Sequence, residues 1–82
     1  MSNNLQKYAN SFKETFQIKD KDLKNLKYQS IENWDSIGHM TLMSSLEETF
    51  QIALETDDII DFSSFEKGKK ILKKYKVNLI SK

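Results

Sequence analysis

Residues 34–40, with the sequence WDSIGHM, introduce the helix on which the predicted fold depends. The first four backbone N–H groups of a helix lack intrahelical partners, and a short polar side chain such as that of Asp35 satisfies one of them. Ser36 then occupies the first helical position, at the positive end of the helix dipole. We therefore expect a helix that Asp35 caps and that exposes the Ser36 hydroxyl at its start.

This helix is predicted to run from Ser36 to about Phe50 and to present two different strips. Steps of 100° per residue bring four apolar side chains into one arc, which we assign to the core: Leu42, Met43, Leu46 and Phe50. A second strip mixes apolar and acidic side chains: Ile37, Met40, Ser44 and Glu47, with Glu48 nearby. Its apolar members are either peripheral core or part of a docking strip, where a flexible methionine suits several partners.

The region before residue 34 contains one further helix and a long loop. Apolar residues at helical spacing predict an amphipathic helix over residues 4–17: Leu5, Tyr8, Ala9, Phe12 and Phe16. Residues 18–35 show no sustained period, which predicts a loop with one helical turn near residues 21–25. A connection of this length in a small domain is unusual unless it is packed or functional.

Two more helices are predicted after residue 50. Thr56 can cap a short helix with Asp57 and Asp58 in its first turn, where acidic groups complement the helix dipole. The apolar residues of this segment are expected to point inward: Ile59, Ile60 and Phe62. Ser63 and Glu66 have the spacing of a capping box, which predicts a last helix over about residues 64–75. Gly68 on its inner face indicates close packing against another helix.

The whole pattern predicts an all-α domain, a small four-helix bundle with a long first loop and a short third helix. Eighty-two residues suit a single domain over 1–82, with a frayed tail at about residues 78–82. The absence of Cys excludes disulfides and thiolate metal sites. No apolar run approaches the ~20 residues of a membrane span, and the polar N-terminus does not resemble a signal peptide. We expect a cytoplasmic monomer without a membrane partner.

The net charge of +1 conceals a strong segregation of charge along the chain. Residues 29–66 contain no Lys or Arg and carry a charge of −9, whereas residues 1–28 carry +3 and residues 67–82 carry +7. One charged run is usually only a solvated helix face. An uninterrupted acidic middle between basic ends additionally suggests that the central helices meet a basic partner surface.

Several function classes have little support in these residues. His39 is the only histidine, and a Ser36–His39 pair has no evident carboxylate or oxyanion partner, so we predict that the chain is not an enzyme. A calcium loop that ends at Glu66 would place isoleucines at its fifth and sixth positions, so no metal site is predicted. The best-formed helix is acidic, so we expect no nucleic-acid partner.

Two segments resemble the acyl carrier protein family. Residues 35–37 read DSI and are followed by GHM, and residues 46–50 read LEETF. The family has Asp-Ser-Leu at the start of a helix that continues toward a Leu-Glu-Glu-x-Phe run, and here Ser36 and Phe50 are fourteen residues apart. The order of helices resembles the family over nearly the whole chain. Ile37 replaces the commoner Leu, and the positive net charge differs from many carriers, which suggests a specialised pathway.

The resemblance implies that a phosphopantetheinyl transferase uses coenzyme A and Mg²⁺ to attach 4′-phosphopantetheine to Ser36. The thiol of this arm would carry acyl groups as thioesters between enzymes of fatty-acid, polyketide or related specialised biosynthesis. Asp35 would cap the helix and contact the transferase. A peptidyl or aminoacyl carrier with the same arm is the nearest alternative, and an unmodified helical protein-interaction module is an alternative of another class.

The resemblance also implies where partners and cargo would bind. Acyl ligases, synthases and transferases would present basic surfaces to six residues: Ile37, Met40, Glu47, Glu48, Asp57 and Asp58. The acyl chain would be sheltered between the helices, in a core lined by Leu42, Met43, Leu46, Phe50, Ile59 and Phe62. The identity of the cargo depends largely on the enzyme that loads the arm.

Overall fold

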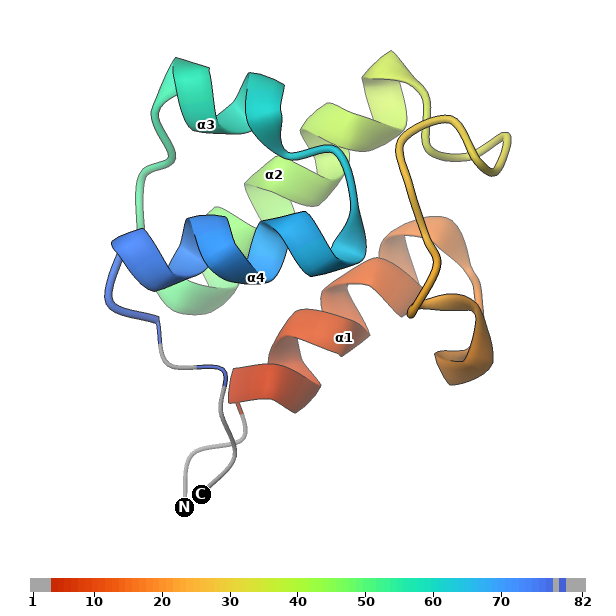
Figure 1. Cartoon of the computed structure of the whole chain (residues 1–82), viewed down its shortest axis with the longest axis horizontal. Coiled ribbons are helices and arrows are strands. Elements are labelled where there is room, and N and C mark those ends of the chain that lie inside the picture. Colours follow the sequence, from red (N-terminus) through yellow and green to blue (C-terminus); the bar gives the residue numbers. More distant parts are fainter. Residues whose placement is uncertain (1–3, 78, 80–82) are drawn as a thin grey trace.

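The computed structural model describes residues 4–77 and 79, which form four α-helices around one apolar core (Figure 1). The helices are α1 (Asn4–Phe16), α2 (Ser36–Phe50), α3 (Thr56–Asp61) and α4 (Phe65–Lys74), and a short 3₁₀ turn, η1 (Asp20–Asp22), lies in the first loop. The described residues form no strand and only one isolated bridge, between Lys27 and Ser64. The predicted helical bundle, with a long first loop and a short third helix, is confirmed at this level.

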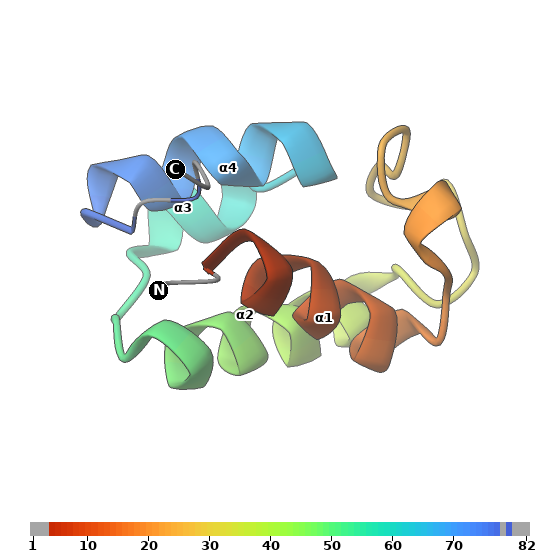
Figure 2. The same ribbon diagram turned by 90° about the horizontal axis from the view of Figure 1, so that it is seen from below.

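The helices lie on different sides of the core. α1 packs most extensively against α2. Figure 2 shows α2 and α4 along opposite faces of the domain, with α1 between them in this view. The first turn of α2 therefore lies on a different side of the domain from the outer face of α4.

Aromatic side chains form the centre of the core. Five of them are almost fully buried: Tyr8, Phe12, Phe16, Trp34 and Phe62. The Phe12 and Trp34 rings meet edge to face with centroids 5.6 Å apart, and Phe16 stacks on Trp34 at 5.2 Å. Such ring pairs add to the stabilisation from burying their apolar area. The aromatic stripe predicted for the first helix is thus confirmed as core.

The Tyr8 hydroxyl connects α1 to α4 inside this core. It donates a hydrogen bond of 2.6 Å to the backbone carbonyl of Phe65. Burial raises the pKa of Tyr8 well above its ordinary value, because the phenolate would lose its hydration. Tyr8 therefore remains a neutral donor and satisfies a carbonyl at the first residue of α4.

The long first loop is fixed to the bundle by buried side chains and backbone hydrogen bonds. Leu23, Leu26 and Trp34 are buried. The backbone N–H of Phe65 donates to the carbonyl of Leu26 at 3.0 Å, and the N–H of Tyr28 donates to the carbonyl of Ser63 at 2.8 Å. The loop is therefore a packed element, and its helical turn lies at Asp20–Asp22, slightly before the predicted position.

The starts of the last two helices differ by one residue from the prediction. α3 begins at Thr56 with Glu55 as its N-cap, and no side chain caps it, so the predicted Thr56 cap is wrong. The N-cap of α4 is Ser64, whose Oγ accepts from the backbone N–H of Lys67 at 2.9 Å, so the predicted Ser63–Glu66 capping box is also wrong. The carbonyl of Ser63 instead pairs with the first loop, and the helix begins after it.

Three expectations about burial also require correction. Ile60 is 72% exposed, because Ile59 and Phe62 occupy the inner side of the short α3 segment. Phe50 is only partly buried, at the last residue of α2. Val77 and Leu79 are buried, so they are not frayed, while residues 78 and 80–82 of the predicted tail lie outside the described residues.

Gly68 lies at a close contact of α4 with α1 and with Phe62, as its sequence position predicted. A Cβ atom at this position would overlap the Tyr8 hydroxyl of α1 and the Phe62 ring. We expect Gly68→Ala to lower the free energy of unfolding by about 1–2 kcal/mol, since overpacking outweighs the gain of about 1 kcal/mol in helix propensity. Urea denaturation measures the change. Lys70→Ala, on the exposed face of the same helix, serves as the control, and a stabilised Gly68→Ala variant would contradict the close packing.

Candidate functional site

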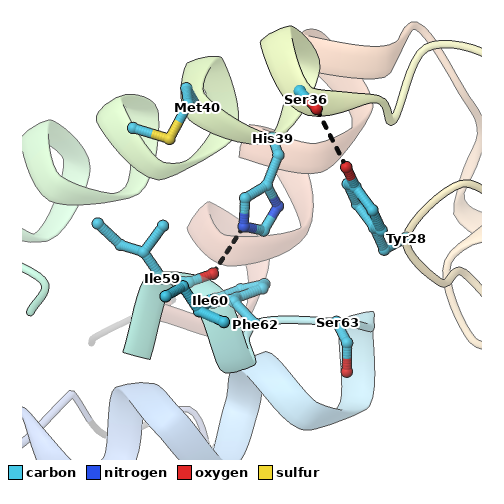
Figure 3. Close-up of a pocket in the computed structure, with 8 residues that line it drawn as sticks. All are labelled: Tyr28, Ser36, His39, Met40, Ile59, Ile60, Phe62 and Ser63. Atoms are coloured by element: carbon cyan, nitrogen blue, oxygen red, sulfur yellow. Dashed lines mark hydrogen bonds between the residues drawn. The ribbon is translucent and has the colours of Figure 1, made fainter. Parts of the chain in front are cut away.

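Ser36 is the first residue of α2, and its side chain is exposed. The Asp35 carboxylate accepts a hydrogen bond of 2.8 Å from the backbone N–H of Gly38, which confirms Asp35 as the helix cap. The Ser36 Oγ lies 3.3 Å from the Tyr28 hydroxyl, which approaches from the first loop (Figure 3). An accessible hydroxyl is therefore held at a capped helix start beside a second hydroxyl.

Gly38 lets the first loop approach the start of α2. A Cβ atom at Gly38 would overlap the carbonyl oxygen of Asn33, so only glycine allows this loop to lie against the first turn. The Asn33 side-chain amide donates to the carbonyl of Phe16 at 3.0 Å, which attaches the same loop to the end of α1. The sequence did not identify this role of Gly38, because the partner of the glycine lies in a segment without periodicity.

A pocket of about 390 Å³ opens beside Ser36, between α2, α3 and the first loop (Figure 3). Its apolar wall is formed by Met40, Ile59, Ile60 and Phe62, and its polar lining by Tyr28, Ser36, His39 and Ser63. The pocket is partly open to solvent, and Ser36 is one of the residues that line it.

The pocket differs from the cavity predicted within the core. Leu42, Met43 and Leu46 are buried at 0–1% exposure among the core side chains and do not line it. Phe50 lies at the other end of α2 and borders a separate hollow. Of the predicted lining, only Ile59 and Phe62 take part, and the wall is completed by residues nearer to Ser36. The reason is that the aromatic core already fills the space between α1 and α2.

His39 connects three parts of the site through its two ring nitrogens. The Trp34 indole N–H donates to Nδ1 of His39 at 2.9 Å, so Nδ1 carries no hydrogen. Nε2 therefore carries the hydrogen and donates to the carbonyl of Ile59 at 2.7 Å. Because both nitrogens have other partners, His39 does not activate Ser36, whose hydroxyl partner is Tyr28. The structure thus assigns His39 a structural role.

The predicted acidic docking residues fall into two groups. Glu48 and Asp57 are exposed. Glu47 is half-buried, and its Oε2 accepts from the backbone N–H of Leu54 at 2.8 Å, so it fixes the link after α2. Asp58 is buried, and its carboxylate accepts from the Lys74 ammonium at 2.6 Å and from the Tyr75 hydroxyl. We therefore remove Asp58 from the predicted docking residues, because it is enclosed within the domain.

The two predicted apolar docking residues are exposed. Ile37 is 79% and Met40 is 52% exposed, so they do not belong to the peripheral core. Ile60 is similarly exposed and borders the same pocket as Met40. The exposure of Ile60 was not predicted, because so short a helix has too few residues to show in the sequence which side faces inward. These three side chains form an exposed apolar patch beside the pocket mouth.

Residues 4–77 and 79 contain no cluster of His, Asp and Glu that could hold a metal ion. Within the same residues, no helix is long and apolar enough to cross a membrane.

Comparison with known proteins does not indicate a function, so any function has to be argued from the site. No family model, no curated protein and no solved structure matches the chain.

Asp58 links the stability of the α3–α4 contact to pH. Hydrogen bonds from Lys74 and Tyr75 hold the pKa of Asp58 below its ordinary value of about 4. A lowered pKa in the folded state means that the stabilisation is complete above the ordinary pKa and is lost as the pH falls through the lowered one. We expect Asp58→Asn to lower the melting temperature at neutral pH, and the difference from wild type to shrink in acid.

The neighbouring Asp57→Asn variant is the matched control, because Asp57 is exposed and lies in the same helical turn. Thermal unfolding followed by circular dichroism at several pH values measures both variants. Equal melting temperatures for the two variants at neutral pH would show that the contacts of Asp58 with Lys74 and Tyr75 do not stabilise the domain.

Proposed function

We propose that the chain is an acyl carrier whose Ser36 bears a 4′-phosphopantetheine arm. The observation that carries this proposal is the exposed Ser36 hydroxyl at a capped helix start, next to an apolar pocket of about 390 Å³. The sequence resemblance at residues 35–40 and 46–50 supports the same function.

The surroundings of Ser36 suit a phosphodiester at this position. The first-turn N–H groups of α2 and the positive end of its dipole favour a negative charge there, as at other helix starts that bind phosphate. The Tyr28 hydroxyl, 3.3 Å from the Ser36 Oγ, can donate a hydrogen bond to a phosphate oxygen. Tyr28 would in this way orient the arm relative to the pocket.

The same surroundings make Ser36 the substrate of a transferase rather than a nucleophile of its own active site. Activation of a serine hydroxyl requires a neighbouring base, and the nitrogens of His39 are bonded to Trp34 and Ile59. The Asp35 carboxylate is bonded to the start of the helix. The transferase would therefore supply the base, with coenzyme A as the donor and Mg²⁺ as its metal.

The pocket favours acyl cargo over aminoacyl cargo. Its wall consists of the side chains of Met40, Ile59, Ile60 and Phe62. An acyl chain that enters this pocket leaves water, which is favourable. The ammonium group of an aminoacyl cargo would lose hydration there, and no described acidic side chain lines the pocket to compensate for it.

We further propose that loading enzymes dock beside the pocket mouth, in the cytoplasm where coenzyme A is supplied, with the carrier acting as a monomer. The docking surface consists of the apolar patch of Ile37, Met40 and Ile60 together with exposed Glu48 and Asp57. A transferase, acyl ligase or synthase with a basic surface would complement it. Glu47 contributes charge but is held by the backbone of Leu54.

The attachment of the arm gives the first test. We expect the purified chain, incubated with coenzyme A, Mg²⁺ and a broad-specificity phosphopantetheinyl transferase, to gain the mass of one phosphopantetheine, because Ser36 is accessible. Intact-mass spectrometry measures the gain. Ser36→Ala should abolish it and Ser44→Ala, an exposed serine of the same helix, should not. An unmodified wild-type chain, or a modified Ser36→Ala chain, would falsify the proposal.

The docking surface gives a separate test. We expect Glu48→Lys and Asp57→Lys each to slow loading by the transferase several-fold, since a charge reversal mainly lowers the association rate. The rate of arm attachment at low salt measures the effect, and circular dichroism verifies the fold. Glu14→Lys, an exposed reversal on α1, makes the same change of net charge elsewhere. Equal rates for all three variants would assign Glu48 and Asp57 to an ordinary solvated face.

A further inference from the structure

The outer face of α4 carries a concentration of lysines that the proposed carrier function does not use. Its inner face is buried through Phe65, Gly68, Ile71 and Leu72. Steps of 100° per residue place all the helix lysines on the opposite side: Lys67, Lys69, Lys70, Lys73 and Lys74. Lys76 follows directly after the helix and is exposed.

Only two of these lysines have ion-pair partners in the described part of the chain. Lys74 pairs with Asp58, and Lys69 pairs with Glu66 and lies 5.0 Å over the Phe65 ring. The others are exposed and form no ion pair among residues 4–77 and 79; we call them the basic face: Lys67, Lys70, Lys73 and Lys76. Among the described residues, no acidic side chain pairs with these four positive charges.

Helix stability does not explain the whole basic face. Lysines near a helix C-terminus interact favourably with the dipole, which accounts for Lys73 and the paired Lys74. Lys67, however, lies at the third residue of α4, near the positive end of the dipole, where a lysine is unfavourable. Lys67 is therefore not explained by stabilisation of the helix that carries it.

The basic face extends onto α1. Lys7 and Lys76 border one hollow of about 430 Å³ between α1, the end of α2 and the end of α4. Lys7 is exposed, and its side chain forms no ion pair with the described residues. Lys7 of α1 thus lies at the same hollow as Lys76.

We infer that the basic face of α4 binds the surface of a phospholipid bilayer that contains anionic lipids. A bilayer surface offers many mobile negative charges, and each lysine held near it strengthens binding about fivefold without any specific geometry. The basic face suits such a target because it is broad, exposed and composed of lysines, which act as point charges. This contact is peripheral and requires no membrane-spanning helix, none of which is found among the described residues.

The composition of the face favours lipid over nucleic acid. All thirteen basic residues of the chain are lysines, so it has no arginine fork for phosphates or bases. The large exposed apolar side chains among the described residues are Tyr28, Ile37, Met40 and Ile60, and none belongs to α4. Tyr75, which follows α4, is half-buried and its hydroxyl is bonded to Asp58 and Glu55, so it is not a free stacking platform for a nucleobase.

The placement of α4 makes this contact compatible with access to Ser36. α2 and α4 lie along opposite faces of the domain (Figure 2), so a bilayer against the outer face of α4 leaves α2, which begins with Ser36, uncovered. The acidic groups near α2 and α3 would be repelled by the same bilayer, which favours one orientation. The inference stands independently of the modification of Ser36.

Vesicle co-sedimentation of the full chain tests the inference, with phosphatidylcholine vesicles that contain or lack phosphatidylglycerol. We expect binding only to the anionic vesicles at low salt, and its loss at high salt, because the contact is electrostatic. Replacement of the four lysines of the basic face by Gln should weaken binding by at least about a hundredfold.

The matched control replaces four exposed lysines of the first loop by Gln, which gives the same net charge: Lys19, Lys21, Lys24 and Lys27. This variant and Ser36→Ala should bind the anionic vesicles as the wild type does. Circular dichroism verifies that both quadruple variants are folded. The inference is overturned if the wild type does not bind, if the two quadruple variants bind equally, or if duplex DNA displaces the vesicles at the same salt concentration.

Discussion

The hydrogen-bonded chain from Trp34 through His39 to Ile59 is the constraint on which the site depends. The indole N–H of Trp34 fixes the tautomer of His39, and the other nitrogen of His39 then holds the carbonyl of Ile59. Since these residues belong to the first loop, α2 and α3, one imidazole sets the relative position of all three. Trp34 is fully buried against Phe12 and Phe16, so this chain is anchored in the aromatic core. The pocket beside Ser36 has its shape because α3 cannot move freely relative to α2.

The first loop takes part in this arrangement because its backbone is paired at both ends of the site. Leu26 and Tyr28 bond to the segment that starts α4, and Asn33 lies against Gly38 in the first turn of α2. Buried leucines supply the apolar area that offsets the entropy lost when the loop is ordered. A long loop in a small domain can therefore serve as part of the scaffold that orients a serine hydroxyl.

The sequence predicted the features that depend on local periodicity and one of the three helix caps. α1, α2 and the Asp35 cap follow from apolar spacing and side-chain length, and the Gly68 contact follows from its position on an apolar face. Features that depend on contacts between distant segments could not be predicted from the sequence. The α4 cap is Ser64 and not Ser63 because the first loop takes the Ser63 carbonyl, and no local pattern records that partner. The pocket lining was misassigned for a related reason, since the volume left beside an aromatic core depends on how three distant segments pack.

The acidic middle of the chain shows how far charge along a sequence can indicate a partner surface. Glu47 and Glu48 are adjacent in sequence, yet one holds the backbone of Leu54 while the other is exposed. Asp57 and Asp58 divide in the same way, because successive residues of a helix point 100° apart and only one of them meets Lys74 and Tyr75. A run of like charges in the sequence therefore suggests more free charge than a partner would meet. Some of its residues are used in hydrogen bonds and ion pairs within the domain. In α4, Lys69 and Lys74 are paired in the same way, which leaves Lys67, Lys70 and Lys73 exposed, with Lys76 beyond the end of the helix. The exposed charged side chains without an internal partner, rather than the total charge of the chain, determine which partner surface each face of the domain can bind.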